Sequence, residues 1–419
     1  MKHTRSLRWG RNDRAHRSRS MENDFAQRTP SSHHFLVRSN AVTNSNPAPL
    51  RAAIVGTGGI SRIHGRRIQD LGSQVVAVCG RQLSGAETLA AELGALATRE
   101  EGTWTVGIRS YDDLGQMLDE TRPDVLHVCS PHGLHRQHAV EAINRGINVI
   151  CEKPLATTPA DARILVDASK AAGVHAAVCL VQRSYPMAAQ LRSLVGAGEV
   201  GRLQAIRGTF LSWDANHDNW GWSFDPAIAG TSYATADLGV HWLDLVEYVT
   251  GSRIREVEAR FSTIRPIRIK DGAEVVVEAE DYVRLFFELA DGTPGSAVFS
   301  GVCAGEPNGC SIDIDGMDGG LHWRADQPNV LQHRRSDASI VTITRDPERL
   351  SPEAGRLAYN PAGHAEGFGD AFRNLIGDVY AAIGGDVREY PTFEDGLRLA
   401  TLVQAIQQSA LTRKAVTID

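Results

Sequence analysis

The sequence predicts an α/β domain built on a parallel sheet, followed by an α+β domain with a large, open-faced, mostly antiparallel sheet. Three observations carry this prediction. Short apolar runs alternate with helical stretches between residues 50 and 181, which is typical of repeated βαβ units. From residue 201 onward, longer runs rich in β-branched residues follow one another with few helices between them. The chain has 419 residues, which is enough for two separate cores.

The first 49 residues differ in charge from the rest of the chain. They hold nine Lys and Arg against three Asp and Glu, lack apolar periodicity and end in Asn-Pro-Ala-Pro, which predicts a disordered basic tail, with Met21 as an alternative start. The net charge of −6 therefore divides into +6 on the tail and −12 on the body. An acidic body argues against nucleic acid as a partner of the folded part. We place the domain boundaries after residues 49 and 181, so that the second domain spans 182–419.

Neither the hydropathy nor the cysteines of the chain indicate export. The sequence has no secretory apolar region of roughly 7–15 residues and no run of about 18 apolar residues, so we expect a cytoplasmic protein without membrane contact. No two cysteines form a C-x-x-C pair, and four of them stand in apolar, strand-like runs, where a thiol behaves as a small buried hydrophobe. We assign no disulfide and no metal. The cysteines are Cys79, Cys129, Cys151, Cys179, Cys303 and Cys310.

The first ordered run, residues 50–55, reads as a strand and leads through a glycine-rich turn into a helix over 62–72. The turn carries the pattern G-x-G-x-x-G/A with serine in the third place. The first glycine allows the tight turn, the second lets a pyrophosphate approach the backbone, and the third place needs a small side chain for helix packing. The pattern therefore predicts a Rossmann dinucleotide-binding domain. Its cofactor-binding residues are Gly56, Gly58, Gly59, Ile60 and Ser61.

The second strand, over 74–79, ends where a dinucleotide-binding domain usually holds the acidic residue that binds the ribose of NAD. This chain has Gly80 there, followed by Arg81. A missing carboxylate and an adjacent guanidinium suit a 2′-phosphate, so the sequence favours NADP over NAD. A solvated loop charge at Arg81 is the alternative interpretation.

The next strand ends in Ser-Pro-His-Gly-Leu-His, where a helix that starts at the strand's end offers free backbone N–H groups to a cofactor. The three histidines at 132, 135 and 138 also have a spacing that a metal site can use. No carboxylate joins them, so we prefer the cofactor interpretation. The predicted cofactor-binding residues are Ser130, Pro131, His132 and His135. The elements expected in this part are helices over 85–93, 112–119 and 138–145 and a strand over 125–130.

An apolar strand that includes Val149–Cys151 ends in Glu152, Lys153 and Pro154. Ligands of open α/β sheets lie beyond the carboxyl ends of the strands, so we expect the Lys153 amine to lie next to a cofactor or a substrate. Pro154 fixes its own φ and favours an extended Lys153, which stiffens the turn. The glycine turn, the Ser-Pro-x-x-x-His and the Glu-Lys-Pro together resemble the Gfo/Idh/MocA oxidoreductase family. The resemblance implies a nicotinamide cofactor and a sugar or cyclitol substrate.

The second half begins with a helix and continues as extended segments. An apolar face on an open sheet needs covering, so we expect a homodimer or homotetramer assembled sheet to sheet. A helix over 159–172 and a strand over 174–181 complete the first domain. The next helix begins with the segment 182–186 and runs to residue 195. The strands expected after it are 203–211, 255–264, 279–288, 295–302 and 311–314.

One helix, expected over 235–249, interrupts the extended segments. Asp237 and His241 stand i, i+4 on its polar stripe, so their side chains can touch. The pattern Asp-x-Gly-x-His-x-x-Asp at 237–244 also resembles the Gfo/Idh/MocA family. The resemblance implies that Lys153 and His241 contact the reacting hydroxyl and that Asp237 supports them.

Oxidation of a secondary alcohol needs a base for the hydroxyl proton and a positive group for the developing alkoxide. His241 is the natural base with Asp237 orienting it, while Lys153 polarises the oxygen or exchanges roles with His241. Glu152 is expected to hold Lys153 or to tune its pKa, and both Glu152 and Gln182 are predicted to lie at the cofactor. The expected substrate-binding residues are Lys153, Arg183, Trp222, Asp237, His241 and His364. For Trp213, Trp220 and Trp222, a place in the core is preferred over a sugar-stacking wall.

The sequence thus predicts an NAD(P)-dependent oxidoreductase that transfers hydride between nicotinamide and a secondary hydroxyl of a sugar, sugar derivative or cyclitol. Two alternatives stay open. A tightly bound cofactor that oxidises its substrate only transiently would enable elimination or glycoside cleavage, and the same fold also serves as a dinucleotide or sugar sensor without turnover. The joint presence of Lys153, Asp237 and His241 argues against the sensor. Net reduction of added cofactor distinguishes the other alternative, because a transient oxidiser releases none.

Overall fold

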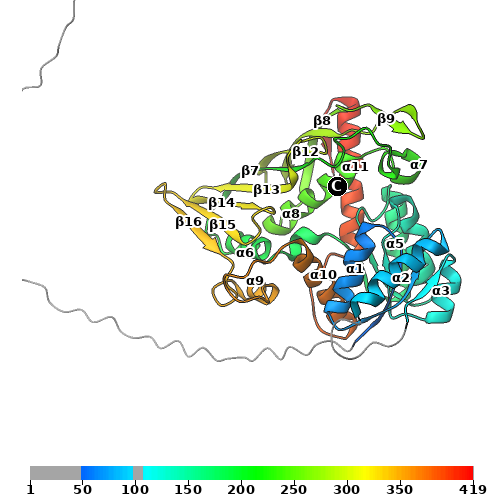
Figure 1. Ribbon diagram of the computed structural model, residues 1–419. Helices are drawn as coiled ribbons and strands as arrows, with labels where there is room; N and C mark the ends of the chain where they lie inside the picture. Colours follow the sequence, from blue (N-terminus) through cyan, green and yellow to red (C-terminus); the bar gives the residue numbers. More distant parts are fainter. Residues whose placement is uncertain (1–48, 98–106, 419) are drawn as a thin grey trace, which may run out of the picture. The chain divides into compact units, whose positions relative to one another are not determined.

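The computed structural model of the chain describes residues 49–97 and 107–418 (Figure 1). The predicted basic tail lies outside the described residues apart from Pro49, so its disorder stays a prediction. Within the described ranges no helix is both long and apolar enough to cross a membrane.

Six parallel strands form the first sheet, in the order β3-β2-β1-β4-β5-β6. This is the strand order of a doubly wound dinucleotide-binding sheet, and the order reverses between β1 and β4. Ligands of such sheets bind at that reversal, beyond the carboxyl ends of the strands. The Rossmann prediction is therefore confirmed. The strands are β1 (Arg51–Val55), β2 (Gln74–Cys79), β3 (Arg109–Tyr111), β4 (Val125–Val128), β5 (Asn148–Cys151) and β6 (Ala176–Val178).

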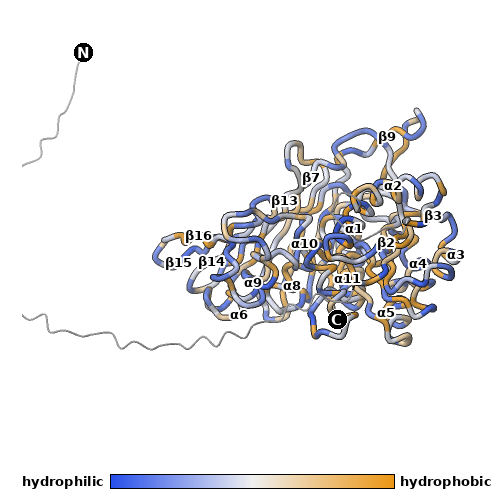
Figure 2. The backbone as a smooth tube through the Cα atoms, turned by 60° about the horizontal axis from the view of Figure 1, so that its bottom comes forward, coloured by the Kyte–Doolittle hydropathy of each residue, from blue (hydrophilic) through white to orange (hydrophobic). Residues whose placement is uncertain are grey.

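Helices cover the strands of this sheet, and the central strand β4 is buried along its whole length, in keeping with the apolar strand segments of Figure 2. Helix α5 has the bounds that the sequence predicts, because the Thr158 side chain caps its first turn and Gly173, with φ of 66°, ends it. Strand β3 is not predicted, since three residues are too few to show a period. The helices are α1 (Gly59–Asp70), α2 (Leu83–Ala97), α3 (Leu114–Thr121), α4 (His135–Ile143) and α5 (Pro159–Ala172).

Nine strands form the second sheet, in the order β16-β15-β14-β13-β7-β12-β11-β8-β17. All neighbouring pairs are antiparallel except β7 and β12. The predicted large, mostly antiparallel sheet is confirmed, although four of its strands and a separate β9–β10 hairpin are not predicted. The strands are β7 (Leu203–Ser212), β8 (Ile254–Ser262), β9 (Ile267–Lys270), β10 (Ala273–Val276), β11 (Tyr282–Leu289), β12 (Pro294–Ser300), β13 (Pro307–Gly316), β14 (Gly319–Arg324), β15 (Val330–Arg335), β16 (Ile340–Thr344) and β17 (Val416–Thr417).

Helices cover the inner face of the second sheet. Trp242 of α8 packs against Phe287 and Phe299 of the sheet, with ring centroids 5.7 and 5.9 Å apart. The last helix, α11, contacts α5 and β6 of the first sheet and β8 of the second, so one buried hydrophobic cluster continues from sheet to sheet (Figure 1). The sequence does not predict α10. The helices are α6 (Pro186–Gly196), α8 (Val240–Thr250), α9 (Pro352–Leu357), α10 (Phe368–Ile383) and α11 (Phe393–Thr412).

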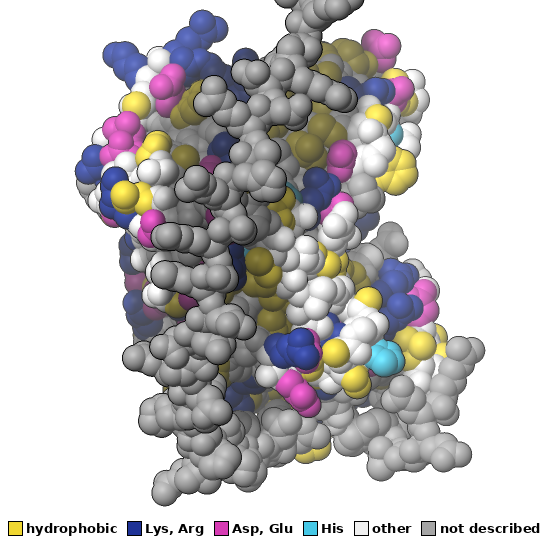
Figure 3. Space-filling view, turned by 90° about the vertical axis from the view of Figure 1, so that its left-hand side faces the viewer, with side chains coloured by type: hydrophobic (Ala, Val, Ile, Leu, Met, Phe, Trp, Pro, Cys, Tyr) yellow, Lys and Arg dark blue, Asp and Glu magenta, His cyan; other side chains and the backbone are white. Residues whose placement is uncertain are grey.

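The outer face of the second sheet carries charges of both signs. Arg207 pairs with Asp315 at 2.8 Å, and Arg334 lies 3.2 and 3.0 Å from Asp313 and Asp315. Figure 3, which views the molecule from the side of β15 and β16 in Figure 1, shows basic, acidic and hydrophobic side chains interspersed. Phe286 of β11 and Ile340 of β16 are exposed apolar side chains of this sheet, with 63% and 61% of their surfaces accessible. The outer face is therefore mixed, and its role in assembly stays a prediction.

Candidate functional site

The glycine turn after β1 lies at the reversal of strand order. Gly56 has φ of 111°, and a Cβ on it would lie 2.4 Å from the carbonyl oxygen of Cys129, so only glycine fits. Gly58 and Gly59 face open space, and no side chain caps the start of α1. Ser61 is fully buried, as the small third residue of the pattern requires. Accessible N–H groups at a helix start bind phosphate oxygens, so the turn fits the pyrophosphate of a dinucleotide.

The residues after β2 determine how a ribose is held. A Cβ on Gly80 would lie 2.8 Å from Cγ2 of Thr57, so an acidic side chain fits there only if Thr57 moves. Arg81 is exposed beside it, and within the described part of the chain no hydrogen bond or ion pair engages its guanidinium. The position that usually binds ribose hydroxyls thus offers a free cation and no carboxylate.

The three histidines after β4 do not converge on one point. His138 Nδ1 lies 2.9 Å from Ser130 Oγ. The buried ring of His135 lies between two carbonyl oxygens, with Nδ1 2.9 Å from Pro154 O and Nε2 2.8 Å from Ser130 O. His135 therefore joins the turn after β4 to the Glu-Lys-Pro turn, and neither of its ring nitrogens is left for a cofactor.

His132 lies beside the catalytic candidates. It is buried at the start of η1 (His132–Leu134), its Nδ1 has no hydrogen-bond partner, and the Trp222 ring stands edge-on at a centroid distance of 4.8 Å. Burial and then the charge of His135 lower the pKa of His132 to about 3, while the nearby carboxylate of Asp237 opposes the shift. The ring is therefore neutral and open to a ligand.

Lys153 and Asp237 bring the two halves of the chain together. Lys153 stands just beyond β5, and Asp237 lies in a π-helical turn, η4 (Ala234–Gly239), directly before α8. Lys153 Nζ donates to Asp237 Oδ1 at 2.5 Å and to Asp237 O at 3.0 Å. Burial opposes the negative charge of Asp237, but Lys153 together with His132 and His241 holds the pKa of this carboxyl below its usual range. Asp237 is therefore ionised at neutral pH.

His241 lies in the first turn of α8. It is buried, stacks on Phe210 with ring centroids 5.7 Å apart, and has no hydrogen-bond partner at Nδ1. Burial and then the charge of Lys153 lower the pKa of His241 to about 3, so the ring is neutral and can accept a proton. In the described structure no hydrogen bond joins the His241 and Asp237 side chains, but the Asp237 carboxylate opposes the lowering of the pKa of His241. Asp237 lies in the π-helical turn before α8, so the two residues do not share one regular α-helix.

Besides Ser61 Oγ in the glycine turn, three buried polar atoms without partners belong to predicted site residues: His132 Nδ1, Gln182 Oε1 and His241 Nδ1. They come from η1, from η2 (Val181–Ser184) after β6, and from α8. Buried polar groups are nearly always hydrogen-bonded in folded proteins, so unpaired ones indicate where a ligand supplies the partner. The three atoms fit the amide of a nicotinamide and the hydroxyls of a substrate.

Two predicted substrate residues lie outside this cluster. The Arg183 guanidinium is held by Asp244, with Nε 2.7 Å from Oδ2, and by Asp395 at 3.2 Å, so it joins η2, α8 and α11. His364 is exposed before α10, where its carbonyl oxygen accepts a hydrogen bond from Arg345. No contact among the described residues connects either side chain with Lys153. Their substrate-binding roles stay predictions.

The tryptophans of the segment between β7 and α8 are not all core residues, so the preferred interpretation is wrong for two of them. Trp213 is 58% exposed and Trp222 is 44% exposed. Trp220 is partly buried, with the Lys270 ammonium 4.9 Å from its ring centroid. Since Trp222 packs on His132 and keeps much of its ring accessible, its position suits the sugar-stacking alternative.

Glu280, between β10 and β11, is a buried residue that sequence reasoning misses. Its Oε1 accepts hydrogen bonds from Ser232 Oγ at 2.6 Å, Thr235 N at 2.9 Å and Thr235 Oγ1 at 2.7 Å. The carboxylate thus caps the start of the π-helical turn that carries Asp237. The only sequence signal is an acidic pair before an apolar strand, which is too common to single it out.

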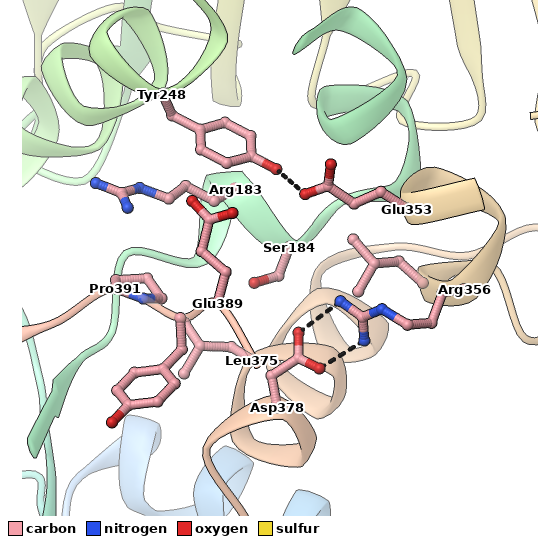
Figure 4. Close-up of a pocket in the computed structure, with 11 residues that line it drawn as sticks. Arg183, Ser184, Tyr248, Glu353, Arg356, Leu375, Asp378, Glu389 and Pro391 are labelled. Atoms are coloured by element: carbon pink, nitrogen blue, oxygen red, sulfur yellow. Dashed lines mark hydrogen bonds and ion pairs between the residues drawn. The ribbon is translucent and has the colours of Figure 1, made fainter. Parts of the chain in front are cut away.

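The cavity drawn in Figure 4 is not lined by Lys153, Asp237 or His241. In it Tyr248 donates to Glu353 at 3.2 Å, and Arg356 pairs with Asp378 at 2.5 and 3.0 Å (Figure 4). Of the predicted site residues, only Arg183 lines it.

Fold and site together define a two-domain, nicotinamide-dependent oxidoreductase. A model described as an oxidoreductase family with an NAD-binding Rossmann fold matches residues 50–180, and one for the GFO/IDH/MocA C-terminal domain matches residues 188–322. The chain belongs to the Gfo/Idh/MocA oxidoreductase family and is an NAD(P)-dependent enzyme.

Characterised relatives agree with this assignment. The chain is 27% identical over 356 residues to levoglucosan dehydrogenase of Pseudarthrobacter phenanthrenivorans, a match that covers 78% of this chain and 87% of the relative. It is 25% identical over 350 residues to glucose-6-phosphate 3-dehydrogenase of Bacillus subtilis, covering 83% and 93%. The crystal structure of an NAD-binding oxidoreductase from Klebsiella pneumoniae superposes with a TM-score of 0.77 at 28% identity, covering 89% of this chain and 100% of that one.

Proposed function

We propose that the protein transfers a hydride between a nicotinamide cofactor and a secondary hydroxyl of a sugar, sugar derivative or cyclitol. The observation that carries the proposal is the cluster of Lys153, Asp237 and His241, which two separate parts of the chain assemble beyond the carboxyl end of β5. Relatives that are named for levoglucosan and glucose 6-phosphate support this substrate class.

Each of these side chains has a task that its surroundings permit. Neutral His241 accepts the hydroxyl proton. The Lys153 ammonium stabilises the negative charge that develops on the same oxygen. Because Asp237 already holds Lys153 through two hydrogen bonds, the ammonium does not have to be ordered when substrate arrives. The nicotinamide, when bound, exchanges the hydride with the substrate.

We further propose NADP(H) as the preferred dinucleotide. Gly80 offers no carboxylate to the ribose hydroxyls, and the free guanidinium of Arg81 stands next to it. A planar guanidinium binds phosphate in a bidentate manner. The Klebsiella relative is named for NAD, so both dinucleotides belong in the assay.

The test measures the absorbance of reduced nicotinamide with purified protein, NADP or NAD, and a panel of sugars, anhydrosugars and cyclitols. We expect a rise with one substrate group, and Lys153→Met should abolish it while nucleotide binding, followed by fluorescence, persists. Lys170→Met is the matched control, since Lys170 is an exposed residue of α5 paired with Glu394, and it should keep full turnover.

Three other results contradict the proposal. If Lys153→Met keeps full turnover, the Lys153 ammonium has no catalytic role. A wild-type protein that gives no rise but releases nucleotide on denaturation is a transient oxidiser. A protein that binds nucleotide and sugar without any turnover is a sensor.

We also propose that the outer face of the second sheet joins copies of the chain in the cytoplasm. Its ion pairs offer charges of both signs that a two-fold copy can match, and Phe286 adds an exposed apolar centre. The six cysteines are all free, which suits a reducing compartment. Light scattering should find a dimer or tetramer for the wild type and a smaller species for Phe286→Arg, whereas a monomeric wild type overturns the proposal.

A further inference from the structure

A row of buried polar side chains lies beneath the Lys153 turn, and none of them touches the reacting hydroxyl in the mechanism above. Glu152 is 6% exposed, and His64, His127 and Tyr380 are fully buried. Glu152 Oε1 lies 2.9 Å from His64 Nε2, and His64 Nδ1 lies 2.8 Å from His127 Nδ1. His127 Nε2 lies 2.8 Å from the Tyr380 hydroxyl. Three consecutive hydrogen bonds therefore connect α10 with the end of β5, and we call these four residues the buried chain.

Glu152 also holds the backbone of the catalytic candidate. Its second oxygen, Oε2, accepts a hydrogen bond from the Lys153 N–H at 3.1 Å. One carboxylate thus binds His64 of α1 with one oxygen and the Lys153 peptide with the other. The orientation of that peptide sets where the Lys153 ammonium stands, and the ammonium has to meet Asp237 at 2.5 Å.

The protonation of the buried chain supports this arrangement. Burial opposes ionisation of Glu152, but the hydrogen bond and the charge of His64 hold the pKa of Glu152 below its usual range. A carboxylate only accepts hydrogen bonds, so His64 Nε2–H donates to it in either charge state of His64. Burial lowers the pKa of His127 and raises that of Tyr380, which keeps both neutral. Every link of the buried chain then has one donor and one acceptor.

A metal ion fits the same place less well. His64 Nε2, a Glu152 oxygen and Cys179 Sγ lie within 4.8 Å of one another. Ligand atoms around a tetrahedral zinc ion stand roughly 3.2 Å or more apart. The 2.9 Å between Nε2 and Oε1 is instead a hydrogen-bond length. Burial raises the pKa of the Cys179 thiol to about 12, which keeps it protonated.

We propose that Glu152 is a positioning residue for Lys153 and that His64, His127 and Tyr380 fix Glu152 in place. The proposal rests on the catalytic role of Lys153 proposed above. Buried hydrogen bonds in a low-dielectric core are strong and directional, so the buried chain holds the carboxylate in one orientation. The buried chain extends from α10 to the Lys153 turn. Phe372 of α10 also packs edge-on against His64, at a centroid distance of 5.4 Å. The C-terminal part of the chain thereby braces a turn of the nucleotide-binding sheet.

Four variants test this role by steady-state kinetics, nucleotide binding and thermal unfolding. Glu152→Ala should lower kcat by roughly 10- to 100-fold, as loss of an orienting partner typically does, with nucleotide affinity unchanged. Glu152→Gln should recover part of the loss, because its amide oxygen still accepts a hydrogen bond from the Lys153 N–H. Tyr380→Phe removes only the hydroxyl at the far end and should lower kcat by a smaller factor. Cys151→Ala is the control, since Cys151 is a buried neighbour of Glu152 outside the buried chain, and it should keep kcat.

The outcomes separate this proposal from the catalytic assignment. If Lys153→Met is inactive but Glu152→Ala and Tyr380→Phe turn over as fast as Cys151→Ala, the positioning role fails and the catalytic assignment stands. If Lys153→Met is active, the catalytic assignment fails by itself. Nucleotide affinity that falls in parallel with kcat in Glu152→Ala assigns the carboxylate to the cofactor and overturns positioning. Tyr380→Phe and Glu152→Gln keep the test valid if Glu152→Ala does not fold.

Discussion

The two sheets supply the candidate site in different ways. In the six-stranded sheet the candidate residues stand where strands end, with Gly56 after β1, Ser130 after β4 and Lys153 after β5. In the nine-stranded sheet they come from a helical segment packed across the inner face, which carries Asp237 and His241. The register of a parallel sheet fixes the first set, and side-chain packing between α8 and the sheet fixes the second. The second set should therefore be more sensitive to changes in packing.

Among changes in the second half of the chain, loss of the His241 imidazole should have the largest effect on turnover. His241→Asn removes the proton acceptor, so kcat should fall by roughly 10²- to 10⁴-fold, the usual range for a general base. Nucleotide affinity should not change, because the glycine turn belongs to the other sheet. Parallel kinetics of Lys153→Met show whether the two halves serve the same step. A His241→Asn enzyme that turns over at the wild-type rate would falsify its role as base.

Gly239 allows a test of the packing between the turn that carries Asp237 and the nine-stranded sheet. A Cβ on Gly239 would lie 2.8 Å from Cδ2 of Phe299, so Gly239→Ala should displace the turn that carries Asp237 and lower both kcat and stability, the latter by about 1–3 kcal/mol. Phe299→Leu in the same chain should recover part of both. Gly94→Ala in α2 is the control, since a Cβ there meets nothing within 4 Å. If Gly239→Ala behaves like the control, packing at this point does not set the site.

The same contrast explains what could be predicted from the sequence. Groups at strand ends are local: an apolar run followed by Gly-x-Gly or Glu-Lys-Pro identifies both the strand and its functional end. The contribution of the second half depends on contacts distant in sequence. Sequence periodicity assumes an α-helical register, so it does not reveal the π-helical turn that carries Asp237. Nothing local to Glu280 reveals that it caps this turn.

The buried chain is the clearest case of a feature hidden from sequence reasoning. His64 stands three residues after Ser61 on α1, His127 lies inside β4, and Tyr380 lies on the unpredicted helix α10. In the sequence, His127 and Tyr380 are isolated polar residues in apolar runs, and His64 stands in a basic stretch between Arg62 and Arg66. Only the fold brings His127 and Tyr380 together, 253 positions apart in sequence. The partners of Arg183 are also distant in sequence, because Asp244 and Asp395 bind its guanidinium.

Arg81, just after β2, allows a test of how the six-stranded sheet binds the dinucleotide. Arg81→Ala should lower kcat/KM with NADP by roughly tenfold or more, as expected for the loss of a charged hydrogen bond, and leave kcat/KM with NAD nearly unchanged. The measurement is the ratio of the two values in variant and wild type. Arg136→Ala, an exposed arginine of α4 paired with Asp161, is the control. Equal losses with both dinucleotides would place Arg81 outside the ribose site.

The smallest expected effect is on stability at acid pH, and it tests whether the two halves unfold together. His132 and His241, with pKa values of about 3, and His138, with a pKa of about 4, are neutral in the fold. In the unfolded chain each takes up a proton near pH 6.5. The unfolded state then binds more protons, so stability is complete above about pH 6.5 and is lost as the pH falls towards 4. The midpoint of thermal unfolding should therefore fall between pH 7 and pH 4.

Two substitutions divide this pH dependence between the halves. His138→Gln removes one such group from the first half and His241→Gln removes one from the second, so each variant should lose less stability than the wild type between pH 7 and pH 4. Since one hydrophobic cluster continues through both sheets, both variants should shift the same single transition in scanning calorimetry. Two transitions, each shifted by only one variant, would show that the halves unfold independently. In that case α11, which contacts both sheets, does not couple them.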